Sequence, residues 1–353
     1  MRAAAALMLV LLAAQLSAQS PCAGPGPVPF QDHEHWGYLS GDGVVIAPRF
    51  DVAGPFGRDG AIACVANQCG VIDRTGAFVS PTWDRYTRPF PEQYAEGLAA
   101  ANKNGDWGYI DAARRVVIPF QYSYAGQFEQ GIARVKKGQK FFFIDKLGNR
   151  ITPEFDGAFD FHEGLAAVEV NKAVGYIRRD GSFALSPSYR SASGIDFSEG
   201  LAAVRVNGKV GFMDKNGNVV IEPRFDDVYP FSDGLAPVRV GDDWGYVDRN
   251  GNLAIPLKFH IGHMFSEGLA SVNMNDKWGY IDRSGRFVVP PIFDSAMPFC
   301  GGVAAVETFQ IIGTETRGCR SSLYRGKRGF IDHAGDYIWR DAEEKTWPSP
   351  FCF

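Results

Sequence analysis

The sequence predicts an all-β fold made of tandem repeats of about 34 residues, each a three-stranded meander stacked on its neighbours. The block FSEGLASVNMNDKWGYIDRSGRFVVPPIFDSA, at residues 265–296, recurs with changes from residue 36 to residue 339. Many of the 41 glycines and 21 prolines recur at fixed places in this block, which indicates turns rather than low complexity. Beyond the first 18 residues, no segment shows the 3.6-residue apolar period of a helix.

Composition and charge narrow the class of protein. Apolar residues make up 45% of the 353 residues and aromatic residues 13%, which is ample for a buried core. The formal net charge is −4, so the strongly basic face of a nucleic-acid-binding protein is not expected. The length allows two ordinary domains or one long repeat array, and the regular repeats favour the array.

Residues 1–18 have the pattern of a secretory signal peptide. Arg2 precedes an apolar run at 3–14 that is too short to span a bilayer, and Ala18 supplies a small residue for cleavage. We therefore expect cleavage after Ala18 and a periplasmic or extracellular protein with no transmembrane segment in its mature chain. An uncleaved anchor is the alternative.

The rest of the chain divides into three segments: an extended N-terminal arm at 19–35, a repeat array at 36–340, and a C-terminal tail at 341–353. The glycine of the W-G-Y-I-D block marks the copies at Gly37, Gly70, Gly108, Gly175, Gly211, Gly245, Gly279 and Gly329, and one further copy has Phe142 instead. Successive markers are 33 to 38 residues apart, except for a final spacing of 50. The ninth copy is therefore expected to contain an enlarged hairpin at 307–328.

Each copy is interpreted as three strands joined by tight turns. In one copy the expected strands are 235–240, 244–248 and 253–259. Asn250-Gly251 favours the positive φ angles of a hairpin turn, and the preceding Asp248 can accept hydrogen bonds from the turn amides. Pro256 indicates that the third strand ends early or lies at a sheet edge.

The glycine of the W-G-Y-I-D block is expected inside a strand, as at Gly279. Glycine weakens a strand interior unless another group packs closely against it. We therefore expect an aromatic ring of a neighbouring repeat to lie over this glycine.

The repeated strings resemble the WG-containing (KWG) repeat family of bacterial exported proteins. The resemblance rests on residues 197–202 (FSEGLA), 278–282 (WGYID) and 223–226 (PRFD), and it extends over nearly the whole chain after residue 35. Individual copies replace the tryptophan with Cys69, Phe141, Val174, Val210 or Arg328. The resemblance implies a repeat β-architecture and no shared catalytic residues.

Two arrangements of the repeats are compatible with this pattern. The 34-residue period and three-strand unit differ from the four-stranded, 40–45-residue blade of WD40 propellers, which favours an open or coiled β-solenoid. The alternative is a closed propeller-like ring, in which the C-terminal tail could replace the strand missing from the first copy.

Six cysteines in an exported chain favour disulfides. Cys64 and Cys69 stand where other copies have Val and Trp on facing strands of a hairpin, so we expect them to pair. The remaining candidate pairs are Cys300 with Cys319 and Cys22 with Cys352, although six cysteines allow fifteen connectivities.

No catalytic, cofactor-binding or metal site is expected. An aspartate recurs after the second strand in seven copies, at Asp73, Asp111, Asp145, Asp214, Asp248, Asp282 and Asp332. A residue repeated so often is better explained by a turn than by catalysis. The histidine pairs His33/His35 and His260/His263 have no Cys or carboxylate partner at a recognised metal spacing.

The enlarged hairpin contains a local basic cluster with one aromatic residue. It comprises Arg317, Arg320, Tyr324, Arg325, Lys327 and Arg328. Insertions into repeats often serve binding, so these residues form a possible binding loop.

The main hypothesis is therefore a non-catalytic binding or scaffold module for an unidentified protein or polysaccharide, without nucleic acid. The alternative is a glycan-active enzyme with carboxylates from degenerate repeats.

Overall fold

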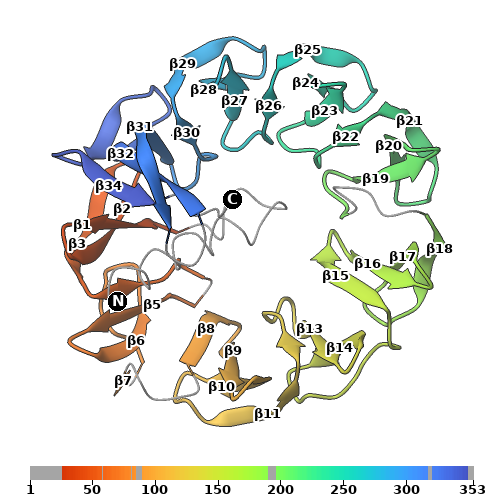
Figure 1. Ribbon diagram of the computed structural model, residues 1–353. Coiled ribbons are helices and arrows are strands. Elements are labelled where there is room, and N and C mark those ends of the chain that lie inside the picture. The colour runs from red at the N-terminus through yellow and green to blue at the C-terminus, as the bar shows by residue number, and fades with distance from the viewer. Residues whose placement is uncertain are drawn as a thin grey trace.

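The computed structural model describes residues 26–57, 59–80, 82–84, 90–189, 196–316 and 320–348. Within these ranges the chain forms nine small antiparallel sheets of three to five strands. Figure 1 shows the sheets arranged as the blades of a closed ring, so the protein is a nine-bladed β-propeller. The expectation of an open or coiled solenoid is wrong, and the closed ring is the correct alternative.

The blades follow one another along the chain. Blade 1 contains β1 (Val28–Asp32), β2 (His35–Ser40) and β3 (Gly43–Phe50). Blade 2 contains β4 (Val52–Ala53), β5 (Ala61–Val65), β6 (Gln68–Ile72) and β7 (Trp83–Asp84). Blade 3 contains β8 (Phe90–Ala95), β9 (Leu98–Lys103), β10 (Asp106–Asp111) and β11 (Val116–Tyr122). Blade 4 contains β12 (Tyr124–Ala125), β13 (Ile132–Lys137) and β14 (Lys140–Asp145). Blade 5 contains β15 (Gly157–His162), β16 (Leu165–Val170), β17 (Ala173–Ile177) and β18 (Phe183–Tyr189). Blade 6 contains β19 (Leu201–Val206), β20 (Lys209–Asp214) and β21 (Val219–Phe225). Blade 7 contains β22 (Asp227–Val228), β23 (Ala236–Val240), β24 (Asp243–Val247) and β25 (Leu253–Phe259). Blade 8 contains β26 (Ile261–Gly262), β27 (Ala270–Met274), β28 (Lys277–Ile281) and β29 (Phe287–Phe293). Blade 9 contains β30 (Ser295–Ala296), β31 (Ala304–Thr316), β32 (Arg320–Ile331), β33 (Tyr337–Arg340) and β34 (Lys345–Pro348).

Most blades have one strand more than the sequence pattern predicts. The extra strand pairs with the first strand of the predicted meander. It has two residues in several blades, as in Asp227–Val228, but six in β8 and β15. Two residues are too few to display the alternation that identifies a strand. The last predicted strand lies at the rim of the ring in most blades, as for β11, β18, β21, β25 and β29 (Figure 1). Strand β25 at this edge contains Pro256 as expected.

The glycine of the WG block is covered from within its own blade. A Cβ on Gly279 would lie 2.6 Å from the carbonyl oxygen of Val289 and 2.7 Å from the nitrogen of Pro291, both on the rim strand β29. The register between β28 and β29 shifts at this point, which brings the rim backbone close. The expectation that a neighbouring repeat's aromatic ring covers this glycine is therefore wrong.

Adjacent blades share a hydrophobic core. One cluster joins Trp244, Tyr246 and Phe259 of blade 7 to Phe265 and Val272 of blade 8. Buried tyrosine hydroxyls add polar links between neighbours, since Tyr246 donates a 2.8 Å hydrogen bond to the carbonyl of His263. Such contacts recur around the ring, and they explain why a meander that is marginal alone is stable in the array.

The ring closes where blade 1 meets blade 9. Each of the nine sheets uses one continuous stretch of chain, so no described strand is exchanged between the first and last blades. The junction instead uses a 3.0 Å hydrogen bond from the Gly41 N–H to the Gly301 carbonyl and a cluster around Phe30 and Val303. Strand β1 (Val28–Asp32) takes the place of the strand missing from the first copy, so the C-terminal tail does not. This strand lies within the segment that was expected to be an extended N-terminal arm. The tail segment Lys345–Pro348 pairs with β32 instead.

The expected signal peptide at 1–18 lies outside the described residues. The part of the chain that the structure describes contains no helix long and apolar enough to cross a membrane.

Candidate functional site: the projecting hairpin

The recurring aspartates hold turns, as expected. Asp248 accepts hydrogen bonds from the backbone N–H groups of Asn250 (2.9 Å) and Asn252 (2.8 Å), while Gly251 has a φ of +84°. The side chain of Asn252 also donates to this carboxylate, and these bonds lower the pKa of Asp248. These hydrogen bonds favour the ionised form of the carboxylate and use its oxygens as acceptors. The side chain is therefore suited to holding a turn rather than to transferring a proton.

The acidic residues of the FSEG turns bind the next blade. Glu199 in blade 6 accepts a 3.0 Å hydrogen bond from the N–H of Gly234, and Asp233 in blade 7 accepts a 2.9 Å bond from Gly268. Glu96 and Lys146 add an ion pair of 3.1 Å across the same kind of joint. The recurring carboxylates at these joints therefore serve ring assembly.

The histidine pairs do not form a metal site. Within the described ranges, no three His, Cys, Asp or Glu side chains are placed to hold a metal ion. His263 instead stacks on Trp278, with ring centroids 4.8 Å apart, and its Nδ1 lies 2.9 Å from the Ser271 hydroxyl. Burial lowers the pKa of His263 to about 4, so the ring is neutral near pH 7.

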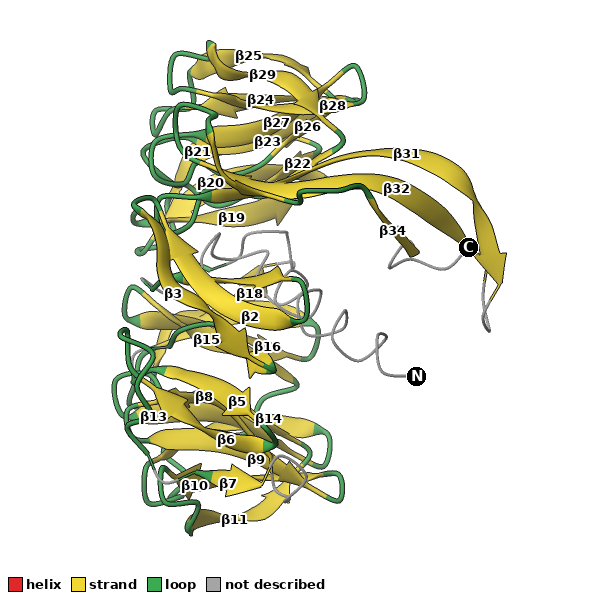
Figure 2. Ribbon diagram, turned by 90° about the vertical axis from the view of Figure 1, so that its left-hand side faces the viewer, coloured by secondary structure: helices red, strands yellow, loops and turns green. Residues whose placement is uncertain are grey.

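The largest departure from the repeat is in blade 9. Strands β31 and β32 have 13 and 12 residues, against five to eight for most other blade strands, and they continue far beyond their blade. Figure 2 shows that this extension leaves one face of the disc. We call residues 308–327 the projecting hairpin. Strand β34 pairs with β32 along it, with Tyr324 opposite Trp347, so the projection is a three-stranded sheet.

A small apolar cluster stiffens the base of the projecting hairpin. The rings of Phe309 and Tyr324 lie 4.5 Å apart. Gly326 lies opposite Phe309, and a Cβ on this glycine would come within 2.6 Å of the Phe309 Cα. Ile311 is 66% exposed and Ile312 38% exposed, so two apolar side chains of β31 face solvent.

Two cations of the predicted basic cluster have partners at the base of the projecting hairpin. Arg328 forms a 3.1 Å ion pair with Glu307, and Lys327 donates a 2.8 Å hydrogen bond to the carbonyl of Ala342. Arg325 is exposed on the hairpin. Arg320 is placed at the start of β32 by its backbone, and Arg317 lies outside the described residues.

Comparison with known proteins agrees with the repeat pattern. The model of the WG containing repeat matches at residues 36–67, 107–141, 141–172, 175–209, 211–242, 244–278 and 278–308, which is more than half of the chain. The chain belongs to the WG-containing repeat family. The projecting hairpin lies almost entirely outside these matches, so it is an addition to the WG repeats. A search of curated proteins finds no match.

Several solved structures match this chain at low sequence identity. The crystal structure of a eukaryotic initiation factor has a TM-score of 0.57 and 12% identity, covering 90% of this chain and 98% of that one. Hsv2p of Kluyveromyces lactis has a TM-score of 0.41 and 7% identity, covering 71% and 94%. An extracellular domain from B. thetaiotaomicron has a TM-score of 0.36 and 10% identity, covering 91% and 55%. Of these three, only the initiation-factor structure has a TM-score above 0.5, and at 12% identity its likeness concerns the fold alone.

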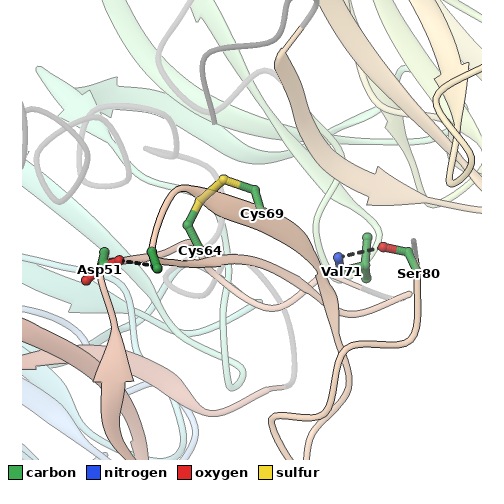
Figure 3. Close-up of a disulfide and its surroundings, with 6 residues drawn as sticks. Asp51, Cys64, Cys69, Val71 and Ser80 are labelled. Atoms are coloured by element: carbon green, nitrogen blue, oxygen red, sulfur yellow. Dashed lines mark hydrogen bonds between the residues drawn. A yellow bond between two sulfur atoms is a disulfide. The ribbon is translucent and has the colours of Figure 1, made fainter. Parts of the chain in front are cut away.

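In one WG copy, a disulfide replaces consensus residues. Cys64 and Cys69 are paired across the β5–β6 hairpin, with Cα atoms 4.0 Å apart (Figure 3), which confirms the expected bond. The neighbouring turn is held by Asp51, whose carboxylate accepts a 2.6 Å hydrogen bond from the Ala66 N–H. Cys300 is also disulfide-bonded. Cys22, Cys319 and Cys352 lie outside the described residues, so their pairings stay predictions.

Sequence reasoning missed the apolar side of the projecting hairpin. It drew attention to the cations of β32, whereas Ile311 and Ile312 of β31 are the large exposed residues. The available signal was the run TFQIIGTET at 308–316, a β-branched stretch without proline or lysine.

Proposed function

We propose that this chain is an exported, non-catalytic binding or scaffold protein whose partner contacts the projecting hairpin. The observation that supports this proposal is the extension of one hairpin far beyond its blade on one face of the disc (Figure 2). Insertions on one face of a repeat array are frequent binding elements. Export rests on the signal-like pattern of residues 1–18.

The use of the consensus residues favours a scaffold role for the disc. The recurring Asp, Glu and Tyr side chains are engaged in turns and joints between blades, as shown by Asp248, Glu199 and Tyr246. These groups therefore have structural partners that a catalytic role would have to disrupt. The disc provides a rigid base from which the hairpin is presented.

The hairpin surface suggests the chemistry of its partner. Exposed Ile311 and Ile312 offer apolar contact, Arg325 offers a cation, and Tyr324 offers a partly exposed ring. Such a mixture suits a protein surface or an anionic polysaccharide better than a duplex nucleic acid, which would require many more cations.

A binding screen tests this proposal on the full oxidised chain. Wild-type protein and the double variant Ile311→Asp/Arg325→Glu would be applied to a glycan array and to crosslinking capture from envelope extracts. We expect a specific glycan or protein to bind the wild type and to be lost by the double variant. The control Val220→Asp changes a 45% exposed rim residue and should bind like the wild type.

Two results would contradict the proposal. Equal binding by the double variant and the wild type would place the partner elsewhere. Release of shortened glycans by the wild type would favour the alternative, a glycan-active enzyme, which alanine changes in the responsible carboxylates would then locate.

A further inference from the structure

In blades 4–9, one position in the turn after the WG block carries a basic side chain that extends towards the preceding blade. These residues are Lys146, Arg179, Lys215, Arg249, Arg283 and His333. Lys215 of blade 6, for example, donates a 2.8 Å hydrogen bond to the Glu163 carbonyl of blade 5 and lies 3.0 Å from the Glu163 carboxylate. The joints between these blades therefore hold a basic side chain against the neighbouring FSEG turn.

An aromatic ring of the same blade lies beside the basic side chain. The Nζ atom of Lys215 is 6.0 Å from the ring centroid of Phe197. His333 stacks on Phe299 with centroids 4.3 Å apart, and its Nε2 lies 3.2 Å from the Glu267 carboxylate. A carboxylate of one blade and a ring of the next thus form a recurring cation site.

The joint between blades 2 and 3 lacks the basic side chain, because Ala112 takes its position in the turn of blade 3. The other two components are present. Asp59 of blade 2 accepts a 2.7 Å hydrogen bond from the Gly97 N–H of blade 3, and Tyr94 takes the place of Phe197. Among the residues that the structure describes, no cation pairs with the Asp59 carboxylate.

A cavity of about 310 Å³ lies at this joint. Asp59, Val79 and Ala112 are exposed and surround its mouth, whereas Val71 and Tyr94 are buried and line its deeper part. The volume is at the lower end of the range for small-molecule sites, which is about 300–1,000 Å³.

Val71 adds to the cavity because its side chain is small. Every other blade has tyrosine or phenylalanine at this position, namely Tyr38, Tyr109, Phe143, Tyr176, Phe212, Tyr246, Tyr280 and Phe330. The Ser80 hydroxyl accepts a 2.9 Å hydrogen bond from the Val71 N–H, which fixes this wall of the cavity (Figure 3). The cavity therefore results from two shortened side chains, at Val71 and Ala112.

We propose that this cavity binds a primary ammonium group on an aliphatic stem of about the length of a lysine side chain. Asp59 pairs with the ammonium, while Val71, Val79 and Tyr94 contact the stem. The ligand is a cation because lysine fills the corresponding place in blades 4 and 6. Arg114, whose charge acts on Tyr94, does not line the cavity and has partners of its own. The site is separate from the projecting hairpin, so this inference does not rest on the proposed function.

A methyl NMR titration of the full oxidised chain tests the proposal. The probe is n-butylammonium, and n-butanol is the uncharged control of the same shape. We expect saturable shifts of the Val71, Val79 and Ala112 methyl signals with a Kd of about 1–10 mM, as suits a ligand of this size. The alcohol should bind at least about tenfold more weakly, because it offers no charge to Asp59.

Three variants locate the site. Asp59→Asn keeps an oxygen for the Gly97 N–H but removes the charge, so it should weaken butylammonium binding at least about tenfold. Ala112→Lys supplies the missing cation from the chain itself and should abolish the saturable shifts of Val71 and Val79. The control Asp106→Asn removes an exposed carboxylate elsewhere in blade 3 and should bind like the wild type.

The proposal is overturned if butylammonium and butanol bind equally, or if Asp59→Asn or Ala112→Lys binds like the wild type. Absence of saturation at about 100 mM butylammonium would overturn it as well. Nα-acetyl-lysine amide identifies the source of the cation: binding at least as tight as that of butylammonium supports a lysine side chain of a partner, and weaker binding supports a free amine. The hairpin variant Ile311→Asp/Arg325→Glu should leave the titration unchanged, so failure of the proposed function and failure of this site are distinguishable.

Discussion

The ring of Phe30 in blade 1 lies 5.5 Å from the indole of Trp339 in blade 9, which joins the two ends of the blade array. Val303 and Leu39 complete the same cluster, so the seam is apolar where other propellers can use an exchanged strand. Within the described residues, closure therefore uses this apolar cluster and the Gly41–Gly301 backbone hydrogen bond rather than a shared sheet.

Replacing Trp339 by alanine should loosen this seam. Loss of a half-buried aromatic side chain is expected to reduce the free energy of unfolding by about 2–3 kcal/mol, measured by denaturant titration. Hydrogen exchange should increase first in β1 and β33. Val44→Ala, at a 49% exposed rim position, should cost less than about 0.5 kcal/mol. An unchanged exchange rate in β1 would show that the seam does not need this ring.

Replacing Gly279 by alanine should destabilise blade 8. The new Cβ would lie 2.6 Å from the Val289 carbonyl oxygen, and the rim strand backbone would have to move. We expect a loss of about 2–3 kcal/mol in chemical denaturation. Gly54→Ala is the matched control, because its Cβ would have no neighbour closer than 3.4 Å and should cost less than about 1 kcal/mol. Equal losses at the two positions would contradict the close approach of the rim strand.

The joint at Glu267 should contribute to the stability of the last blade. Its carboxylate accepts hydrogen bonds from the N–H groups of Gly301 (2.8 Å) and Gly302 (3.0 Å) and lies 3.2 Å from His333 Nε2. Glu267→Ala should therefore cost about 1 kcal/mol in thermal unfolding, and Glu267→Gln less, because an amide oxygen can still accept. Glu343→Ala in the exposed tail should have no measurable effect. A larger loss for glutamine than for alanine would be inconsistent with this account.

Stability should fall in mild acid because of His263. Burial lowers the pKa of this ring from 6.5 to about 4, so between these pH values the unfolded chain binds a proton that the folded chain does not. The free energy of unfolding should accordingly decrease as the pH falls from 6.5 towards 4, by about 2 kcal/mol. Denaturant titrations at several pH values measure this slope.

His263→Tyr is the matched variant for this slope. Tyr229 stacks on Trp244 in blade 7 at 5.1 Å, as His263 stacks on Trp278 in blade 8 at 4.8 Å. Tyrosine should thus keep the stack and remove the pH dependence in this window. If the variant retains the wild-type slope, other groups are responsible for it.

Removing the Cys64–Cys69 disulfide should have a modest effect. The bond closes a short loop, with a sequence separation of 5, so its effect on the entropy of the unfolded chain is small. Replacement of both cysteines by valine should cost about 2 kcal/mol, measured by thermal unfolding without reductant. A loss above about 4 kcal/mol would show that the buried sulfurs also contribute packing that valine does not replace.

Local features of this protein were predictable from the sequence. Asp248 and Gly251 form their turn through contacts within four residues, and Pro256 marks a sheet edge because it lacks a backbone donor. Cys64 and Cys69 pair because a hairpin places them opposite each other. In each case the interacting groups are close along the chain, so the repeat alone determines them.

The tertiary structure decided how the repeats assemble. A small rotation between successive blades accumulates over nine copies, and no single copy shows whether the sum closes a ring. Closure is visible in contacts between opposite ends of the array, such as that between Phe30 and Trp339. The direction of the projecting hairpin likewise depends on where the chain places a long insertion in the finished disc. These features arise from contacts between distant residues, which a local sequence pattern does not contain.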